Sequence, residues 1–97
     1  LEYNKKLSKE ELNLSINDND PITMEEIKDI PKKNLVMIEN VGEKYFCYNA
    51  ITLRQYLFRK ENNKYKSPCT NKELNKEDLD KILNVNIKRI KYFCDIV

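Results

Sequence analysis

The absence of histidine from all 97 residues is the feature that most restricts what this chain can fold into. Its three cysteines, Cys47, Cys69 and Cys94, lie far apart and form no close pair. Structural zinc normally takes four Cys or His ligands, so the chain cannot complete such a site by itself. Scattered cysteines in odd number also give no disulfide framework and indicate a reducing compartment. We therefore expect no metal and no cofactor.

The length suits one ordinary domain, with enough apolar residues for one small core. The longest uninterrupted apolar stretch runs only from Leu35 to Ile38, far below the roughly 20 residues of a membrane-spanning helix. Gly42 is the single glycine, which argues against a phosphate-binding loop. We expect a protein that does not enter membranes and that works inside the cell, in the cytoplasm or the nucleus.

The distribution of charged residues indicates whether this chain could bind nucleic acid. There are 18 basic and 16 acidic residues, and they are interleaved. A nucleic-acid binder usually segregates its positive charge, so the overall pattern argues against one. An alternative places a single strand on a basic, tyrosine-bearing surface. That surface would comprise the 60–66 loop, Tyr65, Lys88, Arg89, Lys91 and Tyr92.

Residues 1–18 are mostly polar and are predicted to form a leader, partly flexible or with one short helix. Ser8 and Glu11 have the spacing of a capping box. Leu12, Leu14 and Ile16 alternate with polar residues, so this part could add an edge strand or dock on the main body. The main domain is expected to span 19–97.

The next segments predict a hairpin and a helix. Residues 35–39 and 44–48 are rich in strand-forming side chains, and the connection between them contains Gly42 for positive φ. Asn49 is a good N-cap for a helix through roughly Lys60. Ala50, Leu53 and Leu57 share one face of that helix.

The second half predicts a loop and one or two helices. Residues 66–70 cross Pro68 as an ordered loop. Asn75 can cap a short helix through Leu83, with Leu79, Ile82 and Leu83 turned inward. Asn86 can cap a last helix. We see no internal repeat, and the order of elements indicates a small α+β domain. The last helix would carry Ile87, Ile90, Cys94 and Val97 on one face.

Two loops flank the predicted hairpin and helix, and the spacing of their residues follows a known pattern. The residues in this pattern are Asp20-Pro21-Ile22-Thr23, Tyr48, Leu53, Tyr56-Leu57 and Pro68-Cys69-Thr70-Asn71-Lys72-Glu73-Leu74. Together they resemble the U-box, the zinc-free relative of the RING domain. The resemblance covers about residues 19–93, and Asn86 matches the residue that opens the family's closing helix.

The resemblance implies a ubiquitin ligase that binds a ubiquitin-conjugating enzyme and promotes ubiquitin transfer without a nucleophile of its own. It also assigns roles. Asp20, Thr23 and Thr70 would stabilise the two loops, and Asn71 would donate a hydrogen bond that orients ubiquitin. Contacts with the conjugating enzyme would come from Ile22, Met24, Tyr56 and Pro68.

A second hypothesis keeps the same scaffold but removes the ligase activity. The chain would then be an interaction or structural module of a larger assembly. Its contact surface would be the closing helix, where a homodimer would form through Ile87, Ile90, Phe93 and Val97.

Overall fold

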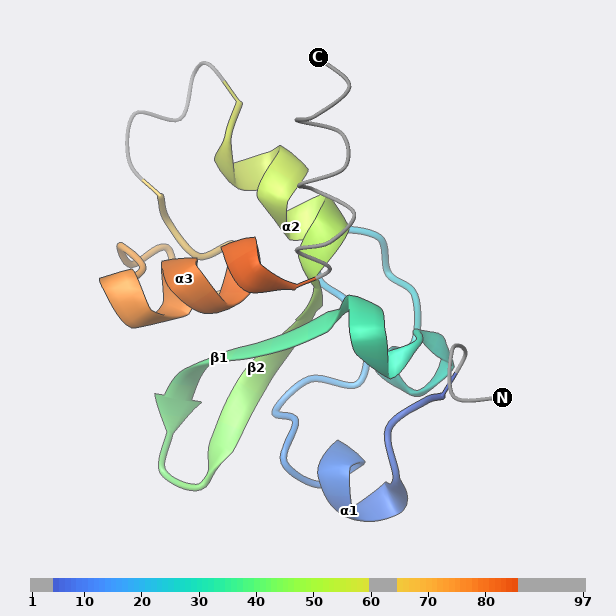
Figure 1. Cartoon of the computed structure of the whole chain (residues 1–97). Coiled ribbons are helices and arrows are strands. Elements are labelled where there is room, and N and C mark those ends of the chain that lie inside the picture. Colours follow the sequence, from blue (N-terminus) through green and yellow to red (C-terminus); the bar gives the residue numbers. More distant parts are fainter. Residues whose placement is uncertain (1–4, 60–64, 86–97) are drawn as a thin grey trace.

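The computed structural model describes residues 5–59 and 65–85 and has the predicted α+β composition. Figure 1 shows a two-stranded hairpin with α2 and α3 on one side and α1 on the other. None of the helices in the described residues is long and apolar enough to cross a membrane. The elements in chain order are α1 (Lys9–Leu12), the 3-10 turns η2 (Ile27–Asp29) and η3 (Lys32–Asn34), β1 (Leu35–Val41), β2 (Lys44–Asn49), α2 (Ala50–Leu57) and α3 (Lys76–Asn84).

The hairpin separates two hydrophobic clusters because successive side chains of a strand point to opposite faces. β1 and β2 are antiparallel, and Val36 lies opposite Tyr48 while Met37 lies opposite Cys47. The first pair belongs to the larger cluster, which contains residues of both helices α2 and α3. The second pair belongs to a smaller cluster with Ile27 and with residues near the N-terminus. Both faces of this short sheet are therefore covered.

The strands extend further than predicted. β1 reaches Val41 and β2 reaches Asn49, so the connection is only the pair Gly42–Glu43. Gly42 adopts φ +66°, the left-handed conformation expected of the single glycine. The strand register shifts between Ile38 and Val41, and within this bulge Glu39 also adopts a positive φ of +56°.

α2 begins as predicted but ends early. The Asn49 side chain accepts hydrogen bonds from the N–H groups of the first turn, which is the expected N-cap. The helix ends at Leu57 instead of continuing to about Lys60. Leu57 is fully buried, whereas Phe58 and Arg59 are exposed, so a further turn would gain no core contact.

α3 is capped by Asn75 as predicted, but its inward face differs from the prediction. Ile82 is fully buried and Leu79 half-buried, whereas Leu83 is 43% exposed, so its inward placement was wrong. Asp78 is buried instead, because its carboxylate accepts a hydrogen bond from the N–H of Glu39 on β1. The predicted last helix, with its cysteine and its dimer residues, lies outside the described residues.

Arg54 joins α2 to the end of α3. One guanidinium nitrogen, Nη1, donates to the carbonyl oxygens of Ile82 at 3.3 Å and Val85 at 2.8 Å. These carbonyls belong to the last turn of α3 and to its C-cap residue, where backbone acceptors lack partners within the helix. Partial burial lowers the pKa of Arg54, although arginine remains charged at neutral pH.

We expect Arg54→Ala to lower the free energy of unfolding by about 1–2 kcal/mol, because it leaves two helix-end carbonyls without their charged donor. Urea denaturation followed by circular dichroism measures the change. Arg59→Ala is the matched control, since Arg59 is exposed at the same end of α2 and makes no bond to α3. Equal stability of the two variants would contradict this role.

The N-terminal segment is attached to the hairpin. The Tyr45 N–H donates to the carbonyl of Leu14, and the Ile16 N–H donates to the carbonyl of Tyr45. The side chain of Asn17 bonds both the N–H and the carbonyl of Cys47. Burial, assisted by the charge of Asp20, raises the pKa of the Cys47 thiol to about 12, so it stays protonated. Cys47 is therefore a small, unreactive residue of the smaller hydrophobic cluster.

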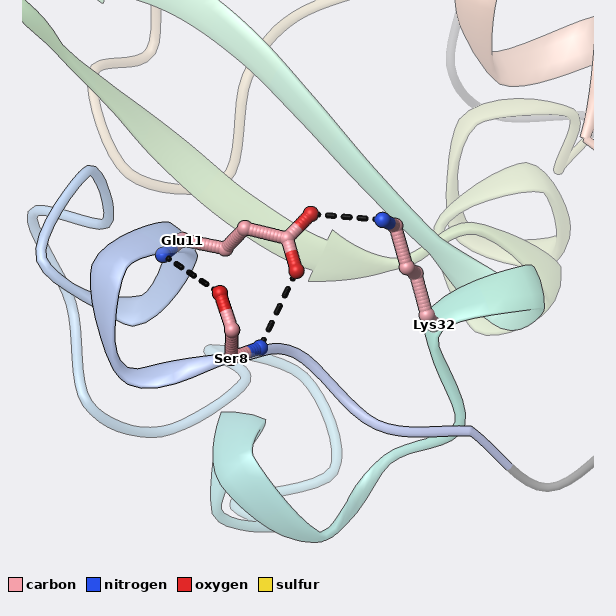
Figure 2. A network of polar contacts seen from close by, with 3 residues as sticks. All are labelled: Ser8, Glu11 and Lys32. Atoms are coloured by element: carbon pink, nitrogen blue, oxygen red, sulfur yellow. Dashed lines mark hydrogen bonds and ion pairs between the residues drawn. The ribbon is translucent and has the colours of Figure 1, made fainter. Parts of the chain in front are cut away.

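The predicted capping box at α1 is present and extends to η3 (Figure 2). Ser8 Oγ accepts from the Glu11 N–H, and Glu11 Oε1 accepts from the Ser8 N–H. The other carboxylate oxygen lies 2.6 Å from Lys32 Nζ. The hydrogen bond from Lys32, followed by that from the Ser8 backbone, lowers the pKa of Glu11 from 4.5 to about 2.

This network predicts a pH dependence of stability. A carboxyl group whose pKa is lowered in the folded state stabilises the fold at every pH above its pKa in the unfolded state. That contribution disappears as the pH falls from about 4.5 to about 2. We expect the melting temperature of Glu11→Gln to fall less across this window than that of the wild type. Glu10→Gln, on the exposed side of α1, should follow the wild type. A wild-type slope in Glu11→Gln would refute the prediction.

Candidate functional site

The first loop, residues 19–26, is organised around the carboxylate of Asp20. Asp20 is fully buried, and its Oδ2 accepts from both the N–H and the hydroxyl of Thr23 at 2.8 Å. The N–H of Met24 donates to the carbonyl of Asp20, and the N–H of Asp20 donates to the carbonyl of Glu25. Met24 has a positive φ of +66°. One buried acid therefore fixes the whole turn.

The second loop, residues 66–73, is organised around the hydroxyl of Ser67. Ser67 is 2% exposed, and its Oγ accepts from the N–H of Thr70 at 3.3 Å. The N–H of Asn71 donates to the carbonyl of Ser67, and the N–H of Ser67 donates to the carbonyl of Lys72. Asn71 has a positive φ of +58°.

The two loops are the same structural unit. A bridge between Asn19 and Glu26 closes the first, and one between Lys66 and Glu73 closes the second. In each, a polar side chain, a proline, a threonine and a residue with positive φ stand at corresponding positions. The prediction that the chain has no internal repeat was wrong. In the sequence, the repeat is marked by a proline followed two residues later by threonine, in Asp20-Pro21-Ile22-Thr23 and in Ser67-Pro68-Cys69-Thr70.

Both loops are attached to the junction between β2 and α2. Asp20 Oδ1 accepts from the backbone N–H of Asn49 at 3.0 Å. The neighbouring Tyr48 places its hydroxyl 3.0 Å from Ser67 Oγ. Tyr48 is fully buried, and this burial is the main reason that its pKa lies well above the usual value. Two consecutive residues therefore hold the two loops.

A further contact attaches the second loop to the hairpin. Thr70 Oγ1 donates to Glu39 Oε2 at 2.7 Å. The N–H of Glu39 in turn donates to Asp78 on α3. The other carboxylate oxygen, Glu39 Oε1, is buried and has no hydrogen-bond partner within the described part of the chain. The loop, the hairpin and α3 thus share one polar network.

The residues predicted to contact a partner differ in exposure. Ile22 on the first loop and Tyr56 on α2 are half-buried and pack against the same hydrophobic cluster. Pro68 is also half-buried. Met24 is 67% exposed, the most exposed large hydrophobic residue of the described chain. Asn71 is exposed, and its side-chain amide makes no hydrogen bond to another described residue, whereas its backbone N–H bonds Ser67.

The structure therefore brings the two loops together at one junction and leaves an apolar and an amide side chain exposed on them. Within residues 5–59 and 65–85, no three cysteine or acidic side chains are grouped as metal ligands. No protein-family model matches this sequence, and no curated protein or solved structure matches it either.

Proposed function

We propose that this chain is a U-box-like domain that binds a ubiquitin-conjugating enzyme and promotes the transfer of ubiquitin. The observation that carries the proposal is the pair of equivalent loops, each closed by its own hydrogen bonds and both attached to Tyr48 and Asn49. Such a pair forms a two-loop docking platform in which polar contacts take the place of metal.

The exposure of Met24 supports docking at the first loop. Left-handed backbone is unfavourable for residues other than glycine, asparagine and aspartate. The corresponding position of the second loop holds Asn71, which tolerates this conformation. A methionine side chain that is 67% exposed at such a position buries little of its apolar surface within the molecule. It is well suited to an apolar contact with a partner, because methionine adapts its shape to the surface that it meets.

The domain would act by orientation. The conjugating enzyme carries ubiquitin as a thioester, and a substrate lysine attacks the carbonyl carbon while the cysteine leaves. Restraining ubiquitin in a reactive geometry raises the rate without a nucleophile from the ligase. Asn71 lies on the second loop with an exposed side-chain amide that can donate to the carried ubiquitin. Ile22, Met24, Tyr56 and Pro68 would bind the conjugating enzyme.

A discharge assay tests the proposal. A panel of ubiquitin-charged conjugating enzymes is incubated with free lysine, with and without the chain, and loss of the thioester is followed over time. We expect at least one enzyme to discharge about tenfold faster with the chain. Unchanged rates across the panel, with no binding of any member, would refute the proposal. Binding without acceleration would identify the inactive interaction module.

Ile22→Ala separates docking from folding. We expect it to abolish accelerated discharge, because Ile22 provides apolar contact area on the first loop, with only a small change in the circular-dichroism melting curve. Leu79→Ala is the matched control, since Leu79 packs half-buried against the same cluster from α3. Loss of the folded state in Ile22→Ala would show that this residue serves the core.

A further inference from the structure

A second surface lies beyond the end of α2. The rings of Phe58 and Tyr65 have centroids 5.1 Å apart in an edge-to-face arrangement. Both are exposed, at 47% and 41%. Each ring is followed in the chain by an exposed basic residue, Arg59 after Phe58 and Lys66 after Tyr65. We call these four residues the aromatic-basic patch.

The patch carries two positive charges, and the bridge between Lys66 and Glu73 places one acidic residue beside it. Neither Arg59 nor Lys66 forms an ion pair with any of the described residues. The Arg59 guanidinium lies 5.9 Å from the centre of the Tyr56 ring, which favours one position for its charge. Exposed aromatic rings next to basic side chains stabilise the binding of a partner that supplies both a planar or apolar group and a negative charge.

We propose that the aromatic-basic patch binds single-stranded nucleic acid. Each nucleotide offers a base that can stack on a ring and a phosphate that can pair with arginine or lysine. Because every nucleotide has both groups, the strand can bind the patch with any of its nucleotides. An acidic peptide would have to alternate carboxylates and apolar side chains to make the same contacts. This binding requires no ubiquitin transfer, and the patch borders the proposed conjugating-enzyme contact because Arg59 lies over Tyr56. It uses local charge, although the whole chain carries only +2.

Fluorescence anisotropy with the full chain and labelled fifteen-nucleotide oligo-dT and oligo-U tests the proposal. We expect saturable binding. Two phosphate contacts to a single strand give a slope of about −1.4 in a plot of log affinity against log salt concentration. The affinity should therefore fall roughly sevenfold between 50 and 200 mM KCl. Tyr65→Leu should weaken binding at least about fivefold, the lower range for loss of one base-stacking ring, while Tyr65→Phe should bind like the wild type.

Charge and folding need their own controls. Arg59→Glu should weaken binding at least tenfold, whereas Lys44→Glu, an exposed charge change on the hairpin, should leave it unchanged. Circular dichroism verifies that each variant is folded. Salt-insensitive binding, wild-type affinity of Tyr65→Leu, or equally tight binding of an oligo-glutamate peptide would overturn the proposal. Because none of these readouts involves ubiquitin, their failure leaves the discharge result unaffected.

Discussion

Replacing Asp20 by alanine should lower the free energy of unfolding by about 3–5 kcal/mol, a large part of the total for a domain of this size. Its carboxylate is fully buried and accepts three hydrogen bonds, two from Thr23 and one from Asn49. Alanine leaves two backbone N–H groups without acceptors, and each such group costs about 1–3 kcal/mol when buried. Urea denaturation at neutral pH measures the loss.

Asp20→Ser provides a graded comparison. Ser67 shows that one hydroxyl at the corresponding position can accept from the threonine N–H of its loop. A serine at position 20 should keep that bond and lose the one to Asn49, so its stability should lie between those of the wild type and the alanine variant. Asp18→Ala is the control, since the exposed Asp18 contributes only its backbone carbonyl. A loss below about 1 kcal/mol in Asp20→Ala would show that the carboxylate does not hold the loop.

Met24→Gly should reduce the discharge of the conjugating enzyme without lowering the stability of the fold, in contrast to Asp20→Ala. Glycine relieves the cost of a positive φ, so the free energy of unfolding should stay the same or rise by up to about 1 kcal/mol. Loss of a central apolar contact at an interface typically costs 2 kcal/mol or more. Discharge of the conjugating enzyme, measured at subsaturating chain, should therefore slow by roughly thirtyfold.

Met24→Asn is the matched variant for this experiment. It copies the residue that occupies the corresponding position of the second loop and tolerates the left-handed backbone. It should also keep the fold and lose the accelerated discharge. If either variant discharges the conjugating enzyme at the wild-type rate, the exposed methionine is not a docking contact.

The parts of the fold set by local chemistry could be predicted from the sequence. Asn49 and Asn75 cap helices because a short side chain can accept from the first free N–H groups, whatever the rest of the chain does. The hairpin follows from two β-rich runs around a single glycine. The capping box of Ser8 and Glu11 has the same local origin.

Features that depend on distant partners could not be predicted. Asp78 is buried on α3 while Leu83 is exposed, because the Asp78 carboxylate meets an N–H of the bulge in β1, 39 residues away. The end of α2 depends on which of its residues are buried, since Leu57 packs in the core and Phe58 is exposed. The equivalence of the two loops was hidden because their central residues differ, an acid in one and a hydroxyl in the other. The shared proline and threonine are a weak signal by themselves, and the matching backbone hydrogen bonds make the repeat clear.

Nuclear magnetic resonance of the isotope-labelled chain, titrated with a conjugating enzyme that it discharges, tests the docking platform most directly. The amide signals that shift should be those of residues 20–24 and 67–71 and of the α2 residues around Tyr56. Signals of the leader, bound to the far side of β2, should stay in place. Shifts confined to the leader and η3, with both loops unchanged, would contradict the account.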